Sequence, residues 1–284
     1  TWHPQALLTL HEGHAWECCL RLGVKTQDPS CRTVGYQHTM VFRESLALTT
    51  PPAMATAWAV PDVVLCLGEI PRELMRAGHE RFRTRMLRFG SFRYRAPRTH
   101  TLADRQRRTI LVTPEGIPSE VGILFDFVSR CARRLPSYAF ILRCHPQVPM
   151  EQALKLAPAG LADQPNVMLS EEASIEDDFA RASVVLYRGS SSVMYGILHG
   201  LLPVYLQAGG SDRDPLYALQ AWRRRCATPE ELAVLLEQYE HTAQDAVETE
   251  WTLALRYVND YTGPVDDGAV DALLASLGLK GNGA

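Results

Sequence analysis

Short hydrophobic runs alternate along the chain with polar turns and with longer amphipathic segments. The runs predict strands at residues 6–10, 33–36, 62–67, 85–89, 109–113, 138–142, 166–169, 182–186 and 202–206. The amphipathic segments predict helices at 15–22, from Pro71 onward, and at 120–135, 150–156, 174–181, 193–200, 229–240 and 243–257. Strands that alternate with helices are typical of βαβ units. The pattern therefore predicts an α/β fold with parallel sheets flanked by helices.

The polar segment at residues 93–108, which contains Pro97, interrupts this pattern and predicts a linker. It divides the chain into two Rossmann-like halves, an N-terminal domain at 1–100 and a C-terminal domain at 101–284. The first half reaches a predicted strand almost at once, and Thr1 is not a usual first residue. We therefore expect a segment of a longer protein with a truncated N-terminal domain.

Composition and cysteine usage bound the class of protein. A hydrophobic content of 46% and a charged content of 21% are ordinary for a soluble globular chain. No apolar run approaches the ~20 residues that span a bilayer, and residues 1–4 lack the features of a signal peptide. The seven cysteines are scattered without a C-x-x-C pair, which disfavours a disulfide framework or a zinc site. We expect a cytoplasmic protein.

Charge is distributed unevenly along the chain. The net charge of −3 disfavours a general polyanion binder, and no nucleic-acid partner is expected. Residues 72–108, however, hold twelve arginines against Glu73, Glu80 and Asp104. This excess suggests a peripheral contact with an anionic membrane or a polyanionic acceptor. A solvated, ion-paired surface is the alternative.

Two polar motifs follow predicted strands in the second half, Arg143-Cys144-His145-Pro146 and Tyr187-Arg188-Gly189-Ser190-Ser191-Ser192. The carboxyl edge of a parallel sheet is where ligands bind in open α/β folds. A Gly-Ser-Ser-Ser turn before a helix offers amide and hydroxyl donors to a phosphate. These motifs predict a nucleotide-phosphate site. The alternatives are a strand-end histidine with an internal partner and an ordinary serine helix cap.

The histidine-proline pair and the serine turn together resemble the C-terminal domain of GT-B glycosyltransferases with cytidine-activated donors. These include bacterial sialyl-, polysialyl- and Kdo transferases and, more distantly, polymerases of teichoic acid synthesis. The turns at 11–17, 35–38 and 114–116 are also similar to a group of bacterial surface-carbohydrate biosynthesis proteins, over most of the chain. The resemblance implies a metal-independent enzyme that moves a sialic-acid-like or Kdo-like sugar from a CMP-linked donor to a surface glycan or lipid-linked oligosaccharide. The glycan would be a capsule or lipopolysaccharide at the inner membrane face.

The resemblance also implies site residues. Contacts to CMP and its phosphate would come from His145, Pro146, Ser190, Ser191 and Ser192. From their places in strand-end turns, and not from the resemblance, Glu115, Gly116, Arg143, Arg188 and Gly189 would complete the donor site. Glu115 could instead orient a neighbour, and both arginines could equally be members of structural ion pairs. The acceptor side would include Gln37 and His38.

The catalytic base is assigned from the turn His11-Glu12-Gly13-His14, which follows a predicted strand. Members of the resembled families have an acidic-acidic-Gly motif there, and here histidine replaces the first acid. Glu12 should emerge at the carboxyl edge of the first sheet, where it could take the acceptor's proton. Glu17, His14 and His38 compete for that role.

No metal or other cofactor is expected beside the nucleotide-sugar donor, because His145 has no partner residue at the spacing of metal ligands. Three alternatives stay open on the same fold. The donor could be UDP- or CDP-linked, the enzyme could be a nucleotide-sugar epimerase, or the chain could be a non-catalytic nucleotide- or glycan-binding subunit.

Overall fold

The computed structural model describes residues 3–49, 57–95, 97, 99–209 and 212–279. The chain forms two compact units. Unit 1 comprises Thr1–Arg95 and Asn259–Ala284, and unit 2 comprises Ala96–Val258. The chain passes from unit 1 to unit 2 after Arg95, close to the predicted boundary at residue 100. The chain returns to unit 1 after Val258, so the segment from Asn259 onward does not belong to the C-terminal domain as predicted.

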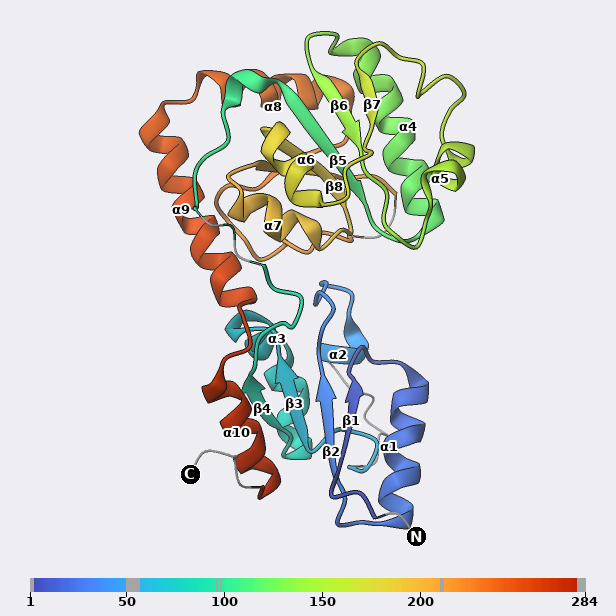
Figure 1. Cartoon of the computed structure of the whole chain (residues 1–284), viewed down its shortest axis with the longest axis vertical. Coiled ribbons are helices and arrows are strands. Elements are labelled where there is room, and N and C mark those ends of the chain that lie inside the picture. Colours follow the sequence, from blue (N-terminus) through green and yellow to red (C-terminus); the bar gives the residue numbers. More distant parts are fainter. Residues whose placement is uncertain (1–2, 50–56, 96, 98, 210–211, 280–284) are drawn as a thin grey trace. The chain divides into compact units, whose positions relative to one another are not determined.

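Unit 1 is built on a parallel four-stranded sheet in the order β1-β2-β3-β4 (Figure 1). The strands are β1 (Ala6–Leu10), β2 (Arg32–Tyr36), β3 (Val63–Cys66) and β4 (Arg85–Arg88). The helices are α1 (Ala15–Gln27), α2 (Leu46–Thr49), α3 (Glu69–His79), the 3-10 turn η1 (Glu80–Phe82) and α10 (Asp267–Leu277).

Alternate residues of β3 face opposite sides of the unit 1 sheet, because successive side chains of a strand point to opposite faces. Val64 and Cys66 pack with Met75 of α3 in one cluster. Val63 and Leu65 belong to a second cluster, which α10 covers with Ala269, Leu273 and Leu277. The sheet is therefore buried on both faces, and the late segment of the chain supplies one of the two covers.

Unit 2 contains a parallel six-stranded sheet in the order β10-β9-β8-β5-β6-β7. The strands are β5 (Thr109–Pro114), β6 (Ala139–Leu142), β7 (Val167–Leu169), β8 (Val184–Arg188), β9 (Leu202–Leu206) and β10 (Arg224–Cys226). Read from β7, this is the 3-2-1-4-5-6 order of the Rossmann fold. The strand order reverses between β5 and β8, which is where such sheets bind their ligands.

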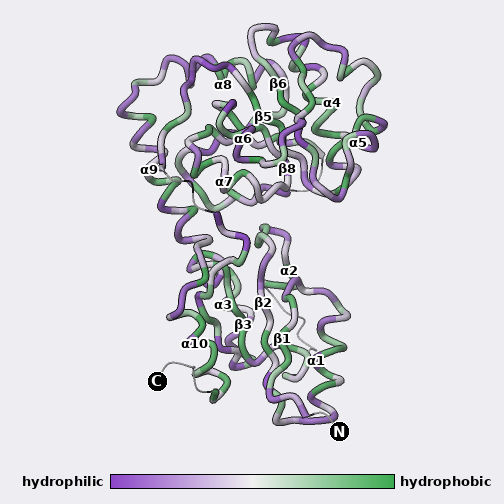
Figure 2. Tube along the Cα trace, viewed as in Figure 1, coloured by the Kyte–Doolittle hydropathy of each residue, from purple (hydrophilic) through white to green (hydrophobic). Residues whose placement is uncertain are grey.

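The helices of unit 2 cover this sheet. They are α4 (Pro118–Arg134), α5 (Met150–Leu156), α6 (Ile175–Arg181), α7 (Ser192–Leu198) and α8 (Pro229–His241), preceded by the 3-10 turn η2 (Arg105–Arg107). Helix α9 (Gln244–Tyr261) contains the boundary at Val258, where the chain returns to unit 1. Helix α4 buries Val121, Leu124, Phe125 and Val128 at helical spacing, and Figure 2 shows hydrophobic and hydrophilic residues alternating along it. It packs on β5, β6 and β8 and against α5 and α8.

The predicted strands are present, with small shifts at their ends. The first helix differs from its prediction, because it continues past Gly23 to Gln27. The short strand β10 and the helices α2 and α10 were not predicted. Within the described ranges, no helix is both long and apolar enough to span a bilayer.

Candidate functional site

Three turns of unit 2 meet at the reversal of strand order. Residues Glu115 and Gly116 follow β5, the turn 189–191 follows β8, and His145 follows β6, the strand on the other side of β5. The Glu115 amide donates to the Arg188 carbonyl across the reversal, with an N–O distance of 3.2 Å. The structure thus brings together the two motifs that the sequence analysis singled out and the Glu115-Gly116 turn.

His145 lies directly against Gly116. A Cβ atom on Gly116 would stand 2.7 Å from His145 Nδ1, so only glycine fits beneath the ring. The backbone N–H of Gln147 donates to His145 Nδ1 at 3.2 Å. In the neutral ring this contact places the proton on Nε2. The ring of His145 therefore lies against Gly116 at the sheet edge, beside exposed Pro146, with Nε2 as the donor in the neutral ring.

The serine turn begins with Gly189 in the left-handed region, at φ 72°. Ser190 is buried, and its Oγ lies 2.7 Å from Ser192 Oγ. Ser191 is exposed and occupies the N-cap position of α7. Its hydroxyl accepts no hydrogen bond from the described backbone amides of that helix. The Ser191 hydroxyl does not act as the ordinary helix cap that was the alternative interpretation.

Glu115 forms a bidentate ion pair with Arg213, a residue of the segment between β9 and β10. Arg213 Nε lies 2.5 Å from Glu115 Oε1, and its Nη2 lies 2.7 Å from Oε2. The Arg213 carbonyl accepts from the Gly189 amide at 3.0 Å, and its amide donates to the Tyr205 hydroxyl at 3.0 Å. Arg213 was not predicted from the sequence, because its partner is 98 positions away and no local pattern links the two.

Arg143 and Arg188 are engaged in internal contacts. Arg188 is 1% exposed, pairs with Glu120, and donates to the Tyr205 hydroxyl at 3.0 Å. Arg143 Nη1 lies 2.6 Å from the carboxylate of buried Asp178. Of the two roles considered for these arginines, the contacts match the structural ion pair.

The turn after β1 in unit 1 holds Glu12 between two histidines. His14 Nε2 lies 3.0 Å from Glu12 Oε2, and His38 Nε2 lies 3.0 Å from Glu12 Oε1. The Glu12 side chain is 21% exposed. The neighbouring Gln37 is buried, and its Oε1 accepts from the Leu67 amide at 3.0 Å. Gln37 therefore supports the loops, whereas Glu12 and the histidines are accessible.

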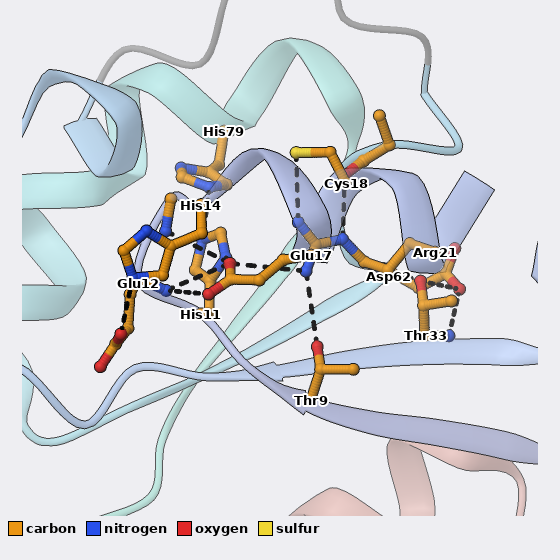
Figure 3. A network of polar contacts seen from close by, with 12 residues as sticks. Thr9, His11, Glu12, His14, Glu17, Cys18, Arg21, Thr33, Asp62 and His79 are labelled. Carbon is orange, nitrogen blue, oxygen red and sulfur yellow. Dashed lines mark hydrogen bonds and ion pairs between the residues drawn. The ribbon is translucent and has the colours of Figure 1, made fainter. Parts of the chain in front are cut away.

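Glu17 is fully buried and holds this turn in shape (Figure 3). Its carboxylate accepts from the Glu12 amide at 3.0 Å and from the Gly13 amide at 3.2 Å. Arg21 Nη1 lies 3.9 Å from Glu17 Oε2. A carboxylate occupied in this way positions the Glu12 loop and is poorly placed to take a substrate proton.

His11 forms the floor of the same region, with its ring edge toward the His79 ring (Figure 3). His79 Nδ1 donates to the Met75 carbonyl at 2.9 Å, so its Nε2 can accept from His11 Nε2 at 3.3 Å. Burial lowers the pKa of His11 to about 3, with smaller contributions from His79 and Arg21. Burial also lowers the pKa of His79. Both rings are neutral at physiological pH.

Ligand atoms of Glu12, His14 and Glu17 lie within 4.8 Å of one another, a spacing that a metal ion could use. No metal site is predicted from the sequence, and this grouping was not among its predictions. The donor set fits a cation poorly, because the Glu17 oxygens already accept amide hydrogens and Arg21 places a positive charge 3.9 Å from one of them.

The arginine-rich stretch 72–108 divides between the two units. Arg72 pairs with Glu69 at 2.5 Å, and Arg76 pairs with Glu73 at 2.9 Å. Arg108 pairs with Glu240 at 2.9 Å. These three of the twelve arginines are thus paired with acids, as in the ion-paired alternative.

Comparison with known proteins places the fold. No protein-family model and no curated sequence matches the chain. Among solved structures, HepE from Anabaena in complex with UDP and glucose aligns with a TM-score of 0.57 and 12% identity, over 95% of this chain and 76% of that one. A putative UDP-N-acetylglucosamine 2-epimerase from Listeria monocytogenes aligns with a TM-score of 0.55 and 15% identity, over 96% of this chain and 74% of that one.

The pneumococcal O-GlcNAc transferase GtfA, in complex with UDP and GlcNAc, aligns with a TM-score of 0.55 and 9% identity. The alignment covers 90% of this chain and 54% of GtfA, so the chain spans about half the length of that transferase. Identities this low bear on the fold. The predicted fold class, with two Rossmann-like domains of GT-B type, is confirmed.

Proposed function

We propose that the chain is a glycosyltransferase that moves a sugar from a nucleotide-activated donor to a glycan acceptor. Unit 2 would hold the nucleotide at the reversal of strand order. The observation that carries this proposal is the meeting of the Glu115-Gly116 turn, the Gly189–Ser192 turn and His145 at that edge. Hydroxyl and amide donors at this place suit a phosphate, and a neutral imidazole N–H can donate to a second oxygen.

The donor is the finer part of the proposal. The histidine-proline pair and the serine turn favour a CMP-linked, sialic-acid-like or Kdo-like sugar, which is the donor we propose. A UDP-linked donor is the competing choice, because UDP is bound in the HepE and GtfA structures. The exposed hydroxyl of Ser191 and the ring of His145 would contact the phosphate in either case.

Glu12 would be the general base for the acceptor hydroxyl. Its carboxylate is accessible, and it contacts two imidazoles that can carry a proton onward. Glu17, by contrast, is buried against backbone amides and serves to position the turn. His38 and His14 are the alternatives to Glu12, and each would use the carboxylate to orient its ring.

A nucleotide-sugar 2-epimerase is the second candidate function. It is favoured by the putative UDP-N-acetylglucosamine 2-epimerase from Listeria monocytogenes, which aligns over 96% of this chain. An epimerase releases no free nucleotide when it converts its substrate, whereas a transferase releases the nucleotide in proportion to the product formed. A subunit that only binds the nucleotide-sugar would catalyse neither reaction.

The experiment that tests the proposal is a thermal-shift screen with CMP, CDP, UMP, UDP and GDP. A nucleotide present at 100 times its dissociation constant should add about 2.7 kcal/mol to the free energy of unfolding. The largest shift with CMP would support a CMP-linked donor, and the largest shift with UDP would replace it with the competing choice. If no nucleotide shifts the melting temperature, the proposed function is wrong.

The acceptor would be a polysaccharide or a lipid-linked oligosaccharide at the inner face of the cytoplasmic membrane. We propose a cytoplasmic protein with a peripheral membrane contact through arginines of the 72–108 stretch. The local excess of arginine over acidic residues in this stretch would supply the attraction to anionic lipid.

A further inference from the structure

Arg213 stands at the reversal of strand order, and four contacts fix it there. Two are the bonds of its guanidinium to Glu115, at 2.5 and 2.7 Å. The other two join its backbone to the Gly189 amide and to the Tyr205 hydroxyl, both at 3.0 Å. Side chain and backbone are thus both tied to residues at the carboxyl edge of β5, β8 and β9.

Glu115 is itself held tightly. Its side chain is 10% exposed, and it fills the space that a side chain at position 189 would need. A Cβ atom on Gly189 would stand 2.2 Å from Glu115 Oε1. Gly189 is at φ 72°, a conformation that glycine adopts without strain. The glycine that opens the serine turn therefore makes room for the carboxylate that holds Arg213.

The two arginines that the sequence analysis assigned to the donor differ from Arg213. Arg188 is 1% exposed, and Arg143 Nη1 contacts Asp178 together with Ser170 and two carbonyl groups. The Arg213 side chain is 29% exposed while its fork is held in a planar, bidentate pair. A fixed guanidinium loses little entropy on binding an oxyanion, and its charge persists at every physiological pH.

We propose that Arg213 is a phosphate-binding residue of the nucleotide site and that Glu115 is its positioning residue. The inference rests on the proposed function, since it names the cation that meets the phosphate at the same site. Arg213 would stabilise the negative charge that develops on the departing nucleotide as the sugar is transferred. Glu115 would act only through Arg213 and would not contact the sugar.

The test is calorimetric binding of a nucleoside, its monophosphate and its diphosphate, with the base chosen by the thermal-shift screen. In Arg213→Gln, affinity for both nucleotides should fall about 10- to 100-fold, because a hydrogen bond to a charged group is lost. Affinity for the nucleoside should not change. Arg213→Lys keeps the charge without the planar fork and should give an intermediate loss.

A double-mutant cycle separates positioning from direct contact. Glu115→Gln should weaken nucleotide binding less than Arg213→Gln does, and the double variant should bind no more weakly than Arg213→Gln alone. The double variant also leaves no buried carboxylate unpaired, so it retains the fold if either single change disturbs it. Arg130→Gln is the matched control and should bind as the parent does, since Arg130 is 48% exposed and 3.2 Å from Asp126 on the surface of α4.

Unchanged nucleotide affinity in Arg213→Gln would overturn the inference, and so would an equal loss of nucleoside and nucleotide affinity. Additive losses in the double variant would overturn the positioning role of Glu115. If the parent protein binds no nucleotide, the proposed function fails first and takes this inference with it. The two failures are therefore distinguishable.

Discussion

Two turns of the molecule share one pattern and differ in chemistry. Each unit has a strand that ends in a Glu-Gly pair before a helix, at Glu12 in unit 1 and at Glu115 in unit 2. Glu12 contacts the imidazoles of His14 and His38, and Glu115 contacts the guanidinium of Arg213. Imidazole exchanges protons near neutral pH, whereas guanidinium keeps its charge.

The difference teaches that the partner decides what a strand-end carboxylate can do. A glutamate beside imidazoles can accept a proton and pass it on. A glutamate in a bidentate pair with arginine would lose that pair if it were protonated, so it serves as a fixed anchor.

Replacement of Glu12 by glutamine should have the largest effect. The amide keeps the size of the side chain but cannot accept the acceptor's proton, so transfer should slow by about 10²–10⁴-fold. Donor affinity should stay at the parent value. Nucleotide release at saturating acceptor measures the rate, and Glu151→Gln, an 84% exposed carboxylate, is the control. Near-normal transfer by Glu12→Gln would pass the base role to His14 or His38.

Changes in the nucleotide site of unit 2 should affect binding and spare the base. We expect His145→Ala and Ser191→Ala each to weaken nucleotide binding by about 1.5–3 kcal/mol, the value of a hydrogen bond to a charged group. The matched unit 1 variant, His38→Ala, should bind nucleotide as the parent does. Calorimetry at one salt concentration measures all three, and equal affinities throughout would remove the site from unit 2.

The buried histidine beneath the Glu12 turn predicts a pH dependence of stability. The pKa of His11 is lowered to about 3 in the folded protein, chiefly by burial, and the unfolded residue has its ordinary value of about 6.5. Between these values the unfolded chain binds a proton that the folded chain does not. The stabilising effect of the neutral ring is therefore present above pH ~6.5 and is lost as the pH falls toward 3.

The free energy of unfolding should fall by up to about 1.4 kcal/mol per pH unit from this residue alone. Urea unfolding at pH 7 and at pH 5 measures it, with His11→Gln as the comparison. The variant should be less stable at pH 7 and should show a shallower decline. Parallel pH dependences in the two proteins would mean that the pKa of His11 is the same in the folded and the unfolded chain.

Membrane attraction should be the smallest effect. Binding to vesicles with anionic lipid should be weak at low salt and should disappear as salt rises, because surface charges are screened over about 8 Å at physiological ionic strength. Neutral vesicles are the control. A protein that ignores anionic vesicles at low salt would leave the arginines of residues 72–108 with an ion-paired, structural role only.

Local patterns predicted the strands and the glycine turns, because buried strands and backbone turns leave signals within a few residues. They placed Glu12 and Glu115 correctly at strand ends. They could not predict that His38 would reach Glu12, since the two residues follow different strands and only the pairing of β1 with β2 brings them together. The pairing of Glu115 with Arg213 depends on tertiary structure in the same way.

Helix α10 escaped prediction for a related reason. The segment Asp267–Leu277 is apolar on the side that packs against Val34 and Leu65 of unit 1, but those partners lie more than 200 positions earlier. Strand β10 is only three residues long and contains two arginines, so it lacks the apolar run of a buried strand. Its place at the edge of the sheet explains why charged residues are tolerated there.

The return of the chain to unit 1 after Val258 has a consequence for synthesis on the ribosome. Unit 2 is continuous, so all of its strands and the helices that cover them have emerged once residue 258 is clear of the exit tunnel. Unit 1 emerges earlier but lacks α10, and Val63, Leu65 and Phe89 stay exposed to solvent until that helix arrives. The unit that is made first is therefore the one that finishes folding last, and its open face is where nascent chains would meet a chaperone.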